Sequence, residues 1–370
     1  MPSYKNLVFK GGGVRGIAYV GALKYLYENG LTRSLERVAG TSAGAITALV
    51  LALNPESFSE IKRIADSLDY RKVPSEGEKS EQGEQGAKGS QGEGGSALAR
   101  AAQLWQKSQS LGIVKNLQCT LRLVQDKGWY SSDYFYNWLR EVIASRFSVD
   151  KKIFTFADFA DPSIHQGGRP FFDLYVTGTD ISNRTSRLFS AETTPGMEVA
   201  LAVRISMSIP LFFEAVPYQY PGTERPQVYA DGGVMLNYPL SVFDDQKYCR
   251  RLDRGMNPET LGLFLYSSPD ATEYKEVKGM VDYISALFES LLLVQERLVL
   301  YGEKNKGRTI FISDEGIPST DFDLAPGDEK YAKLFDSGYR AAAEFFDHNA
   351  NWDLMLNRLQ KRFGWKGAQD

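Results

Sequence analysis

Cysteine and histidine are scarce in this chain, with two of each among 370 residues. The two cysteines, Cys119 and Cys249, do not form the closely spaced pairs of a metal site. Their scarcity fits a reducing compartment. Positive charge is not in excess either, because the formal net charge is −3. A nucleic-acid-binding chain normally has a basic footprint, so we expect no nucleic-acid partner.

Long apolar runs are also missing. The best candidate, ISALFESLLLVQERLVL at 284–300, is interrupted by Glu289 and Glu296, so it is unsuited to spanning a bilayer. We expect no signal peptide, because NLVFK at 6–10 runs directly into a glycine loop and cleavage there would remove a strand. The expectation is a soluble, cytoplasmic protein whose membrane contact is peripheral.

Alternating strand and helix patterns predict an α/β fold. A short apolar strand at 6–10 precedes a helix at 16–30, and a strand at 35–40 precedes a uniformly apolar helix at 41–53. This order is typical of a parallel sheet with helices on both faces. Further helices are expected at 131–147, 196–209, 281–303 and 328–348, and further strands at 171–181, 185–192, 260–268, 307–313 and the start of 227–240.

The composition changes between Ser75 and Ser96, where Ala87 is the only apolar side chain among Gly, Glu, Gln, Ser and Lys. Such a segment cannot bury enough apolar surface to offset its ordering entropy. Glycine recurs at every third position from Gly83 to Gly95, but without proline a stable collagen-like triple helix is not expected. We predict a flexible, disordered Gly/Glu-rich insert.

The glycine loop fits a dinucleotide fingerprint, because Gly11, Gly13 and Gly16 match G-x-G-x-x-G between a strand and a helix. That fingerprint also needs an acidic residue at the end of the second strand to hold the ribose. Here the second strand ends in Val38-Ala39-Gly40-Thr41, with no carboxylate. The sequence therefore disfavours a dinucleotide cofactor.

A G-x-S-x-G motif, Gly40 to Gly44, stands at this second strand end. At a strand-to-helix junction such a motif forces the serine into a strained turn that projects its hydroxyl from the sheet. The following helix would direct its positive dipole end at an oxyanion on the serine. A nucleophilic Ser42 is the favoured interpretation, and an ordinary serine N-cap is the alternative.

The neighbouring glycine loop can then serve that nucleophile. Adjacent parallel strands place their carboxyl-end loops side by side, so the amides of Gly11, Gly12 and Gly13 can face Ser42 as an anion cradle. Arg15 has three open roles: it completes the cradle, binds a phosphate group, or pairs with a carboxylate elsewhere.

A serine nucleophile needs a base. His165 and His348 lie in a loop and in the tail, and we interpret both as surface residues. Asp231 follows an apolar strand and precedes two glycines, so it also lies at a strand end. A carboxylate there can accept the Ser42 proton if burial raises its pKa. The alternative for Asp231 is a simple Asp-Gly turn.

Together the three motifs resemble the patatin-like phospholipase family. The family pattern is an oxyanion loop G-G-G-x-R/K-G, a G-x-S-x-G nucleophile and a D-G-G/A base, in that order. They stand here as Gly11 to Gly16, Gly40 to Gly44, and Asp231-Gly232-Gly233. LAVRISMSIPLFFEAV, GWYSSDYFYNWL and LYVTGTDI also fall in the family's order. The resemblance covers roughly 5–315 and leaves out the insert and the C-terminal part.

The resemblance implies a three-layer α/β/α sandwich around a mostly parallel sheet. It implies a Ser42–Asp231 dyad that hydrolyses phospholipids, lysophospholipids or acylglycerols, without metal or organic cofactor. The oxyanion hole would comprise Gly11, Gly12, Gly13, Arg15 and Ala43, and the supporting glycines would be Gly16, Gly40, Gly44, Gly232 and Gly233. We divide the chain into a catalytic domain at 1–315, with the insert at 75–96 and a cap or lid region at 97–130, and a C-terminal helical extension at 316–370.

Two other activities are compatible with these residues. One is an acyltransferase or transacylase that uses the same acyl-enzyme with an alcohol in place of water. The other is a catalytically idle lipid-binding protein. The sequence also leaves open whether a protein or a ligand activates the chain.

Two segments are candidates for lipid contact: the aromatic segment at 129–139 and the leucine-rich helix at 284–300. For both we favour packing in the core, because apolar helical spacing more often serves that purpose.

Overall fold

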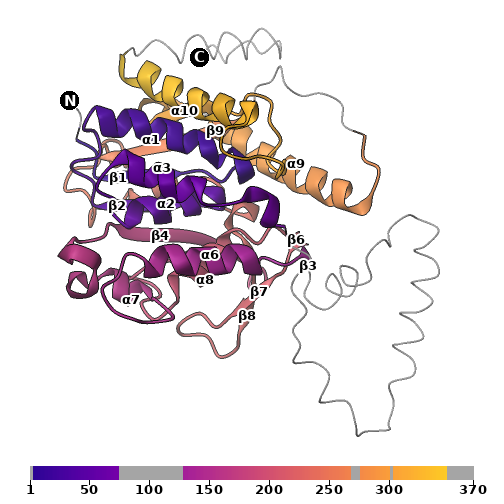
Figure 1. Ribbon diagram of the computed structural model, residues 1–370, viewed down its shortest axis with the longest axis horizontal. Helices are drawn as coiled ribbons and strands as arrows, with labels where there is room; N and C mark the ends of the chain where they lie inside the picture. The colour runs from indigo at the N-terminus through magenta and orange to yellow at the C-terminus, as the bar shows by residue number, and fades with distance from the viewer. Residues whose placement is uncertain (1–2, 75–127, 268–275, 301–302, 348–370) are drawn as a thin grey trace, which may run out of the picture.

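The computed structural model describes residues 3–74, 128–267, 276–300 and 303–347 (Figure 1). The predicted insert at 75–96, most of the predicted cap region and His348 lie outside these residues. The strands are β1 Asn6–Phe9, β2 Arg37–Gly40, β3 Gly128–Tyr130, β4 Asp173–Asp180, β5 Thr185–Phe189, β6 Leu211–Phe213, β7 Val216–Tyr218, β8 Gln227–Asp231, β9 Thr260–Tyr266 and β10 Thr309–Ser313. The α-helices are α1 Ile17–Glu28, α2 Ala43–Ala52, α3 Phe58–Asp66, α6 Asp133–Ala144, α7 Phe156–Phe159, α8 Val199–Ser206, α9 Met280–Leu300 and α10 Glu329–Asp347, and the 3-10 turns used below are η1 Gly13–Gly16, η5 Gly232–Val234 and η6 Leu240–Phe243.

The predicted fold class is confirmed: a central, mostly parallel sheet is covered by helices. Its strand order is β10-β9-β1-β2-β4-β8-β7, with β5 paired to β4 as well. The five strands β10, β9, β1, β2 and β4 are parallel to one another, whereas β5 and β8 pair antiparallel with β4, and β7 pairs antiparallel with β8. The parallel strands are buried, and β1 has no exposed residue. Such burial on both faces explains why these strands are continuous apolar runs.

The two faces of the sheet pack against different parts of the chain. Leu7 and Phe9 of β1 contribute to a large core with helices α1, α2, α6 and α8, which lie in front of the sheet in Figure 1. Val8, between them, contributes to a smaller core with Leu240 and Phe243 of η6. The alternation follows from the two-residue period of a strand.

The register of β4 places two distant strand ends next to each other. Val176 of β4 pairs with Gly40 of β2 on one side and with Phe189 of β5 on the other. Farther along β4, Gly178 pairs with Asp231 of β8, which takes up the side that β2 has left. Strands β2 and β8 therefore point toward each other along the same side of β4, and their ends meet near Gly178.

The C-terminal helix α10 packs directly on α1. Gly338 of α10 lies against the Ala18 carbonyl, and Gly21 of α1 lies against the Phe335 carbonyl, so that a β-carbon at either glycine would collide with backbone. Tyr25 adds an edge-to-face contact with Tyr339. The first part of the predicted extension thus lies on the helical layer of the sheet (Figure 1).

The interpretation of His165 as a surface residue is wrong. Its side chain is only 2% exposed, and its ring stacks on Phe171. Its two ring nitrogens lie within hydrogen-bond distance of the carbonyl oxygens of Asp158 and Arg169. The residue belongs to an aromatic cluster that includes Phe159 of α7. In the part of the chain that the structure describes, no helix has the length and apolar character needed to cross a membrane.

Candidate active site

Ser42 occupies a strained corner between β2 and α2. Its backbone has φ 53° and ψ −127°, a region that non-glycine residues rarely adopt. The corner is tight because Gly40 lies against the Gly44 carbonyl and Gly44 against the Phe9 carbonyl, where a side chain would not fit. The strained turn that the motif predicts is therefore present.

The Ser42 hydroxyl donates a hydrogen bond to Asp231. Ser42 Oγ lies 2.7 Å from Asp231 Oδ2, and the two side chains are 6% and 0% exposed. The other carboxylate oxygen, Oδ1, accepts the Gly233 amide at 2.6 Å. Gly232, which stands between Asp231 and Gly233 in the chain, packs against Thr177 with no room for a β-carbon. The two strand ends that meet beside β4 thus bring the predicted nucleophile and base into contact.

Burial raises the pKa of Asp231 to about 7, although hydrogen bonds from Ser42 and the Gly233 amide favour the ionised form. No Lys, Arg or His of the described chain contributes to this shift. A carboxylate in such surroundings is a stronger base than an exposed one. It can accept a proton near neutral pH.

The glycine loop lies beside this pair. A β-carbon at Gly11 would be 3.1 Å from the Ser42 β-carbon, and one at Gly16 would be 3.2 Å from that of Ala43. Gly13 has φ +60° and lies against the Ser319 carbonyl, so both conformation and space favour glycine there. The loop and the nucleophile corner are therefore direct neighbours.

The three glycine amides are not equivalent. The Gly11 amide donates to the Asn237 carbonyl at 3.0 Å, so it is engaged, in contrast to the expected row of three open amides. The amides of Gly12, Gly13 and Ala43 have no hydrogen-bond acceptor among the described residues. Ala43 is the first residue of α2, where a helix leaves its amides unpaired.

Arg15 pairs with a carboxylate, which is one of the three roles left open by the sequence. Its guanidinium is buried and lies 2.7 Å from Asp314 Oδ2, and Ser267 joins the same cluster. Its Nε also donates to the Gly12 carbonyl at 2.9 Å. Through these bonds Arg15 links the Gly12 carbonyl of the glycine loop to Asp314.

The turn after α8 supports both members of the pair. The resemblance places this helix and its Pro turn beside the active site, but the sequence does not indicate the individual contacts. Ser206 Oγ accepts the Ser42 amide at 2.9 Å, and the Ser208 carbonyl accepts the Asp231 amide at 2.7 Å. Met207, between them, places its sulfur 3.8 Å from Ser42 Oγ. The helix ends at Ser206, a few residues earlier than expected, and this early end frees the three residues for these contacts.

Helix α9 supports the site from another side. Gln295 Nε2 donates to the Gly233 carbonyl, and Gln295 Oε1 accepts the Asn237 amide. Glu296 forms a buried ion pair with Lys10, the residue before the glycine loop, at 2.9 Å. Asn237 Nδ2 is buried without a hydrogen-bond partner in the described chain, next to Gly11. Neither spacing nor motif marks these residues in the sequence.

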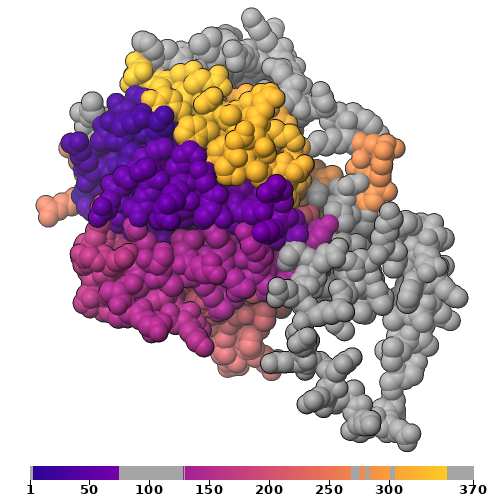
Figure 2. Space-filling view, viewed as in Figure 1, coloured from indigo at the N-terminus to yellow at the C-terminus, as the bar shows by residue number. Residues whose placement is uncertain are grey.

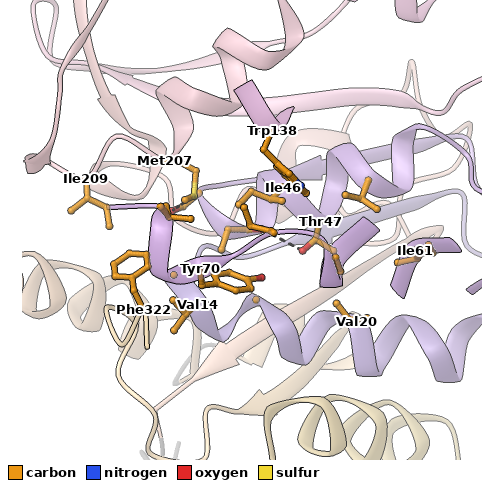
Figure 3. Close-up of a pocket in the computed structure, with 18 of the residues that line it drawn as sticks. Val14, Val20, Ile46, Thr47, Ile61, Tyr70, Trp138, Met207, Ile209 and Phe322 are labelled. Atoms are coloured by element: carbon orange, nitrogen blue, oxygen red, sulfur yellow. Dashed lines mark hydrogen bonds between the residues drawn. The ribbon is translucent and has the colours of Figure 1, made fainter. Parts of the chain in front are cut away.

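An apolar pocket extends from Ser42 between the helices. Figure 3 shows Ile209, Phe322 and Met207 toward one end, Val20 and Ile61 toward the other, and Tyr70 between them. Its remaining lining is largely aliphatic, with Trp138 of α6 at one wall. The aromatic segment at 129–139 is thus at least partly core, as expected, because Phe135 and Trp138 are buried. The lining of the pocket is thus apolar in character.

Comparison with known proteins identifies the family. The "Patatin-like phospholipase" family matches residues 7–244, which is more than half of the chain. The chain is 26% identical to uncharacterized protein YqhO of Bacillus subtilis (strain 168), over 92% of this chain and 98% of that one. It is 27% identical to uncharacterized protein R571 of Acanthamoeba polyphaga mimivirus, over 65% of this chain and 62% of that one.

Among solved structures, VipD from Legionella pneumophila superimposes with a TM-score of 0.54 at 22% identity, covering 94% of this chain and 67% of VipD. That likeness concerns the fold. On the family match, the chain belongs to the patatin-like phospholipase family, a family of lipid hydrolases.

Proposed function

We propose that this protein hydrolyses fatty-acyl esters of lipids, as a phospholipase A or lysophospholipase, through an acyl-enzyme on Ser42. The observation that carries the proposal is the 2.7 Å hydrogen bond from the Ser42 hydroxyl to a fully buried Asp231. The apolar pocket beside Ser42 supports an acyl chain as the group that binds there.

In the first step Ser42 Oγ attacks the ester carbonyl carbon while Asp231 Oδ2 accepts its proton. The tetrahedral intermediate then collapses, the bond to the alcohol oxygen breaks, and Asp231 returns the proton to that oxygen. A raised pKa suits both transfers, because the same carboxyl group acts as base and then as acid. The alcohol or lysolipid leaves, and the fatty acyl group stays on Ser42.

The oxyanion of the intermediate is proposed to bind the amides of Gly12, Gly13 and Ala43. Arg15 has a defined part in this arrangement. Because its Nε holds the Gly12 carbonyl, and because the N–H of a trans peptide points opposite to its carbonyl, the Gly13 N–H points away from Arg15. Arg15 is therefore proposed to orient the donor rather than to touch the substrate. The N-terminal end of α2 adds its dipole to the Ala43 amide.

Deacylation repeats these steps with water. A water molecule gives its proton to Asp231 as its oxygen attacks the acyl carbonyl carbon, and the proton returns to Ser42 Oγ as the fatty acid leaves. The Gly233 amide holds Asp231 Oδ1 throughout, so that Oδ2 stays directed at the reacting oxygen.

The test uses a water-soluble acyl ester and the intact chain, beside Ser42→Ala and Asp231→Asn. Both variants should lose at least about a thousandfold in kcat, as variants of serine nucleophiles and their bases do. For the unmodified chain, kcat/KM should rise as the pH increases through about 7 and then level off, because Asp231 has to be ionised to accept a proton. A fluorophosphonate should label Ser42.

Hydrolysis that survives in a folded Ser42→Ala variant would overturn the proposal. A pH profile that is flat between about 5 and 8 would contradict Asp231 as the base.

A further inference from the structure

Helix α9 has an apolar stripe on its outer face. Five exposed apolar residues follow one another at intervals of three or four, which places them on one side of a helix. They are Tyr283 (56% exposed), Leu287 (49%), Leu291 (49%), Val294 (60%) and Leu298 (72%). A surface helix normally directs polar residues outward, so this stripe is unusual. The expectation that the leucine-rich helix packs in the core therefore holds for its inner face and not for this outer one.

The inner face of α9 has an unusual share of polar contacts. Glu296 pairs with Lys10, and Gln295 bonds to the turn that follows Asp231. Glu289 accepts the Ser319 hydroxyl, and the Ser319 carbonyl in turn accepts the Val14 amide of the glycine loop. The first two bonds end at residues next to the candidate active site, and the third reaches its glycine loop through Ser319. Glu289, Gln295 and Glu296 are thus directed inward, beside buried apolar residues such as Ile284 and Phe288.

Further exposed apolar side chains lie on or next to elements that α9 contacts. Helix α9 packs against β6 and η5. Leu211 at the start of β6 is 43% exposed and Met235 after η5 is 45% exposed. Leu211 also has φ +66°, which is costly for a leucine. It stands between Ile209 and Phe213, which line the pocket, so this strained backbone presents an apolar side chain next to the pocket.

The chemistry of the stripe favours a lipid surface as its occupant. On α9 the two described carboxylates, Glu289 and Glu296, are turned inward, and the described exposed polar residues are Ser290 and Arg297. From Tyr283 to Leu298 the stripe is about 22 Å long at 1.5 Å per residue. Helix α9 lies toward the right-hand side of the molecule in Figure 1, and Figure 2 shows orange atoms of the 276–300 segment at the surface there.

We propose that the outer face of α9, together with Leu211 and Met235, docks on a zwitterionic phospholipid surface next to the pocket. The stripe has little charge and the whole chain is slightly acidic, so docking depends on apolar insertion and only weakly on salt. The choice of a lipid partner rests on the proposed function, because a lipid hydrolase has to reach its substrate at an interface.

Flotation with phosphatidylcholine vesicles tests the docking without catalysis. The full chain carrying Ser42→Ala should float with the vesicles. Adding Leu287→Asn, Leu291→Asn and Leu298→Asn should weaken binding by roughly tenfold or more, because three apolar side chains leave the contact. A matched control adds Val149→Asn, Ile153→Asn and Ile181→Asn, which remove three exposed apolar side chains elsewhere. The control should bind as the parent does, and both variants should unfold at the parent's temperature.

Activity measurements separate this proposal from the proposed function. With Ser42 intact, the α9 variant should hydrolyse a water-soluble ester at the parent's rate but vesicle lipid at least about tenfold more slowly. If the parent binds vesicles through α9 but hydrolyses no ester, the proposed function fails and the docking stands.

Equal vesicle binding by the α9 variant and the control, or no binding by the parent, would overturn the docking. If the α9 substitutions convert an oligomer into a monomer and leave vesicle binding unchanged, the face belongs to a second copy of the chain, and the docking is wrong.

Discussion

Asp231 is fully buried. The turn in which it lies supplies only one backbone hydrogen-bond donor, the Gly233 amide, to its carboxylate. In most proteins a buried carboxylate is stabilised by a cation or by several donors. Here Ser42 and the Gly233 amide are the donors, and burial outweighs them, so that the pKa rises to about 7. The folded protein therefore holds this group at a cost in stability whenever it is ionised.

This cost predicts a pH-dependent gain of stability in Asp231→Asn. The unfolded pKa is 3.8 and the folded value is about 7, so folding takes up a proton between them. The unmodified chain thus loses stability as the pH rises from about 4 through 7, whereas an amide does not titrate. Measured by urea unfolding, the stability of the variant relative to the parent should be about 2–3 kcal/mol more favourable at pH 8 than at pH 5.

An exposed carboxylate serves as the control for that measurement. Asp336 is exposed on α10, so Asp336→Asn is the matched substitution that removes no buried carboxylate. A difference between parent and Asp231→Asn that does not vary with pH would show that the Asp231 pKa is close to its ordinary value.

At the level of single residues, the sequence predicted those that belong to local motifs. Ser42, Asp231 and the glycine loop could be found because a strand end, a glycine and a nucleophile stand next to each other in the chain. Their supporting contacts come from far away, as Ser206 is 164 residues from Ser42 and Asp314 is 299 from Arg15. No spacing rule predicts such pairs.

At the level of elements, the least predictable feature was the direction of β8. An apolar strand that ends at Asp231 suggests another parallel strand, yet β8 is antiparallel and meets β2 end to end along β4. The direction of β8 depends on its pairing with β7 and on the loop between these two strands, and no local sequence pattern indicates either of them. The turn after α8 then connects the two strand ends.

We predict that Ser206→Ala impairs catalysis through the backbone of Ser42. Removing the Ser206 hydroxyl leaves the Ser42 amide without its acceptor at a strained position, which costs about 1–3 kcal/mol. The kcat on a soluble ester should fall by roughly tenfold, with a smaller change in KM, because the pocket lining is untouched.

Ser208→Ala is the matched comparison on the same turn. The Ser208 hydroxyl bonds to the Arg204 carbonyl, while its backbone carbonyl, which holds Asp231, is kept in the variant. It should retain most of the parent's kcat. An equal loss in both variants would assign the effect to the helix end as a whole.

At the level of the whole molecule, the packing of α10 on α1 bears on whether the C-terminal part of the chain is a unit separate from the sheet and its helices. The sequence suggested an extension beginning at 316, because the resemblance ended there. In the structure, Gly21 and Gly338 let α1 and α10 approach closely, and Ser337 of α10 also bonds to the carbonyl of Ser313 in β10. Helix period alone does not show which surface an amphipathic helix covers.

We predict that Gly338→Ala destabilises the protein as a whole. The added methyl group would collide with the Ala18 carbonyl and push the two helices apart, at a cost of about 1–3 kcal/mol. The single unfolding transition should shift to lower temperature, by calorimetry. Asp336→Ala, on the exposed side of the same helix, should leave it nearly unchanged. Separate melting of the C-terminal part would show instead that α10 folds independently.

The end-to-end meeting of β2 and β8 has a consequence for the life of the newly made chain. Ser42 and Asp231 are 189 positions apart, and β4 has to be in place before their strands can converge. Contacts between such distant positions form late, after the local ones. A nascent or partly folded polypeptide therefore has Ser42 without Asp231 beside it, so the proposed ester hydrolysis should begin only when folding is complete.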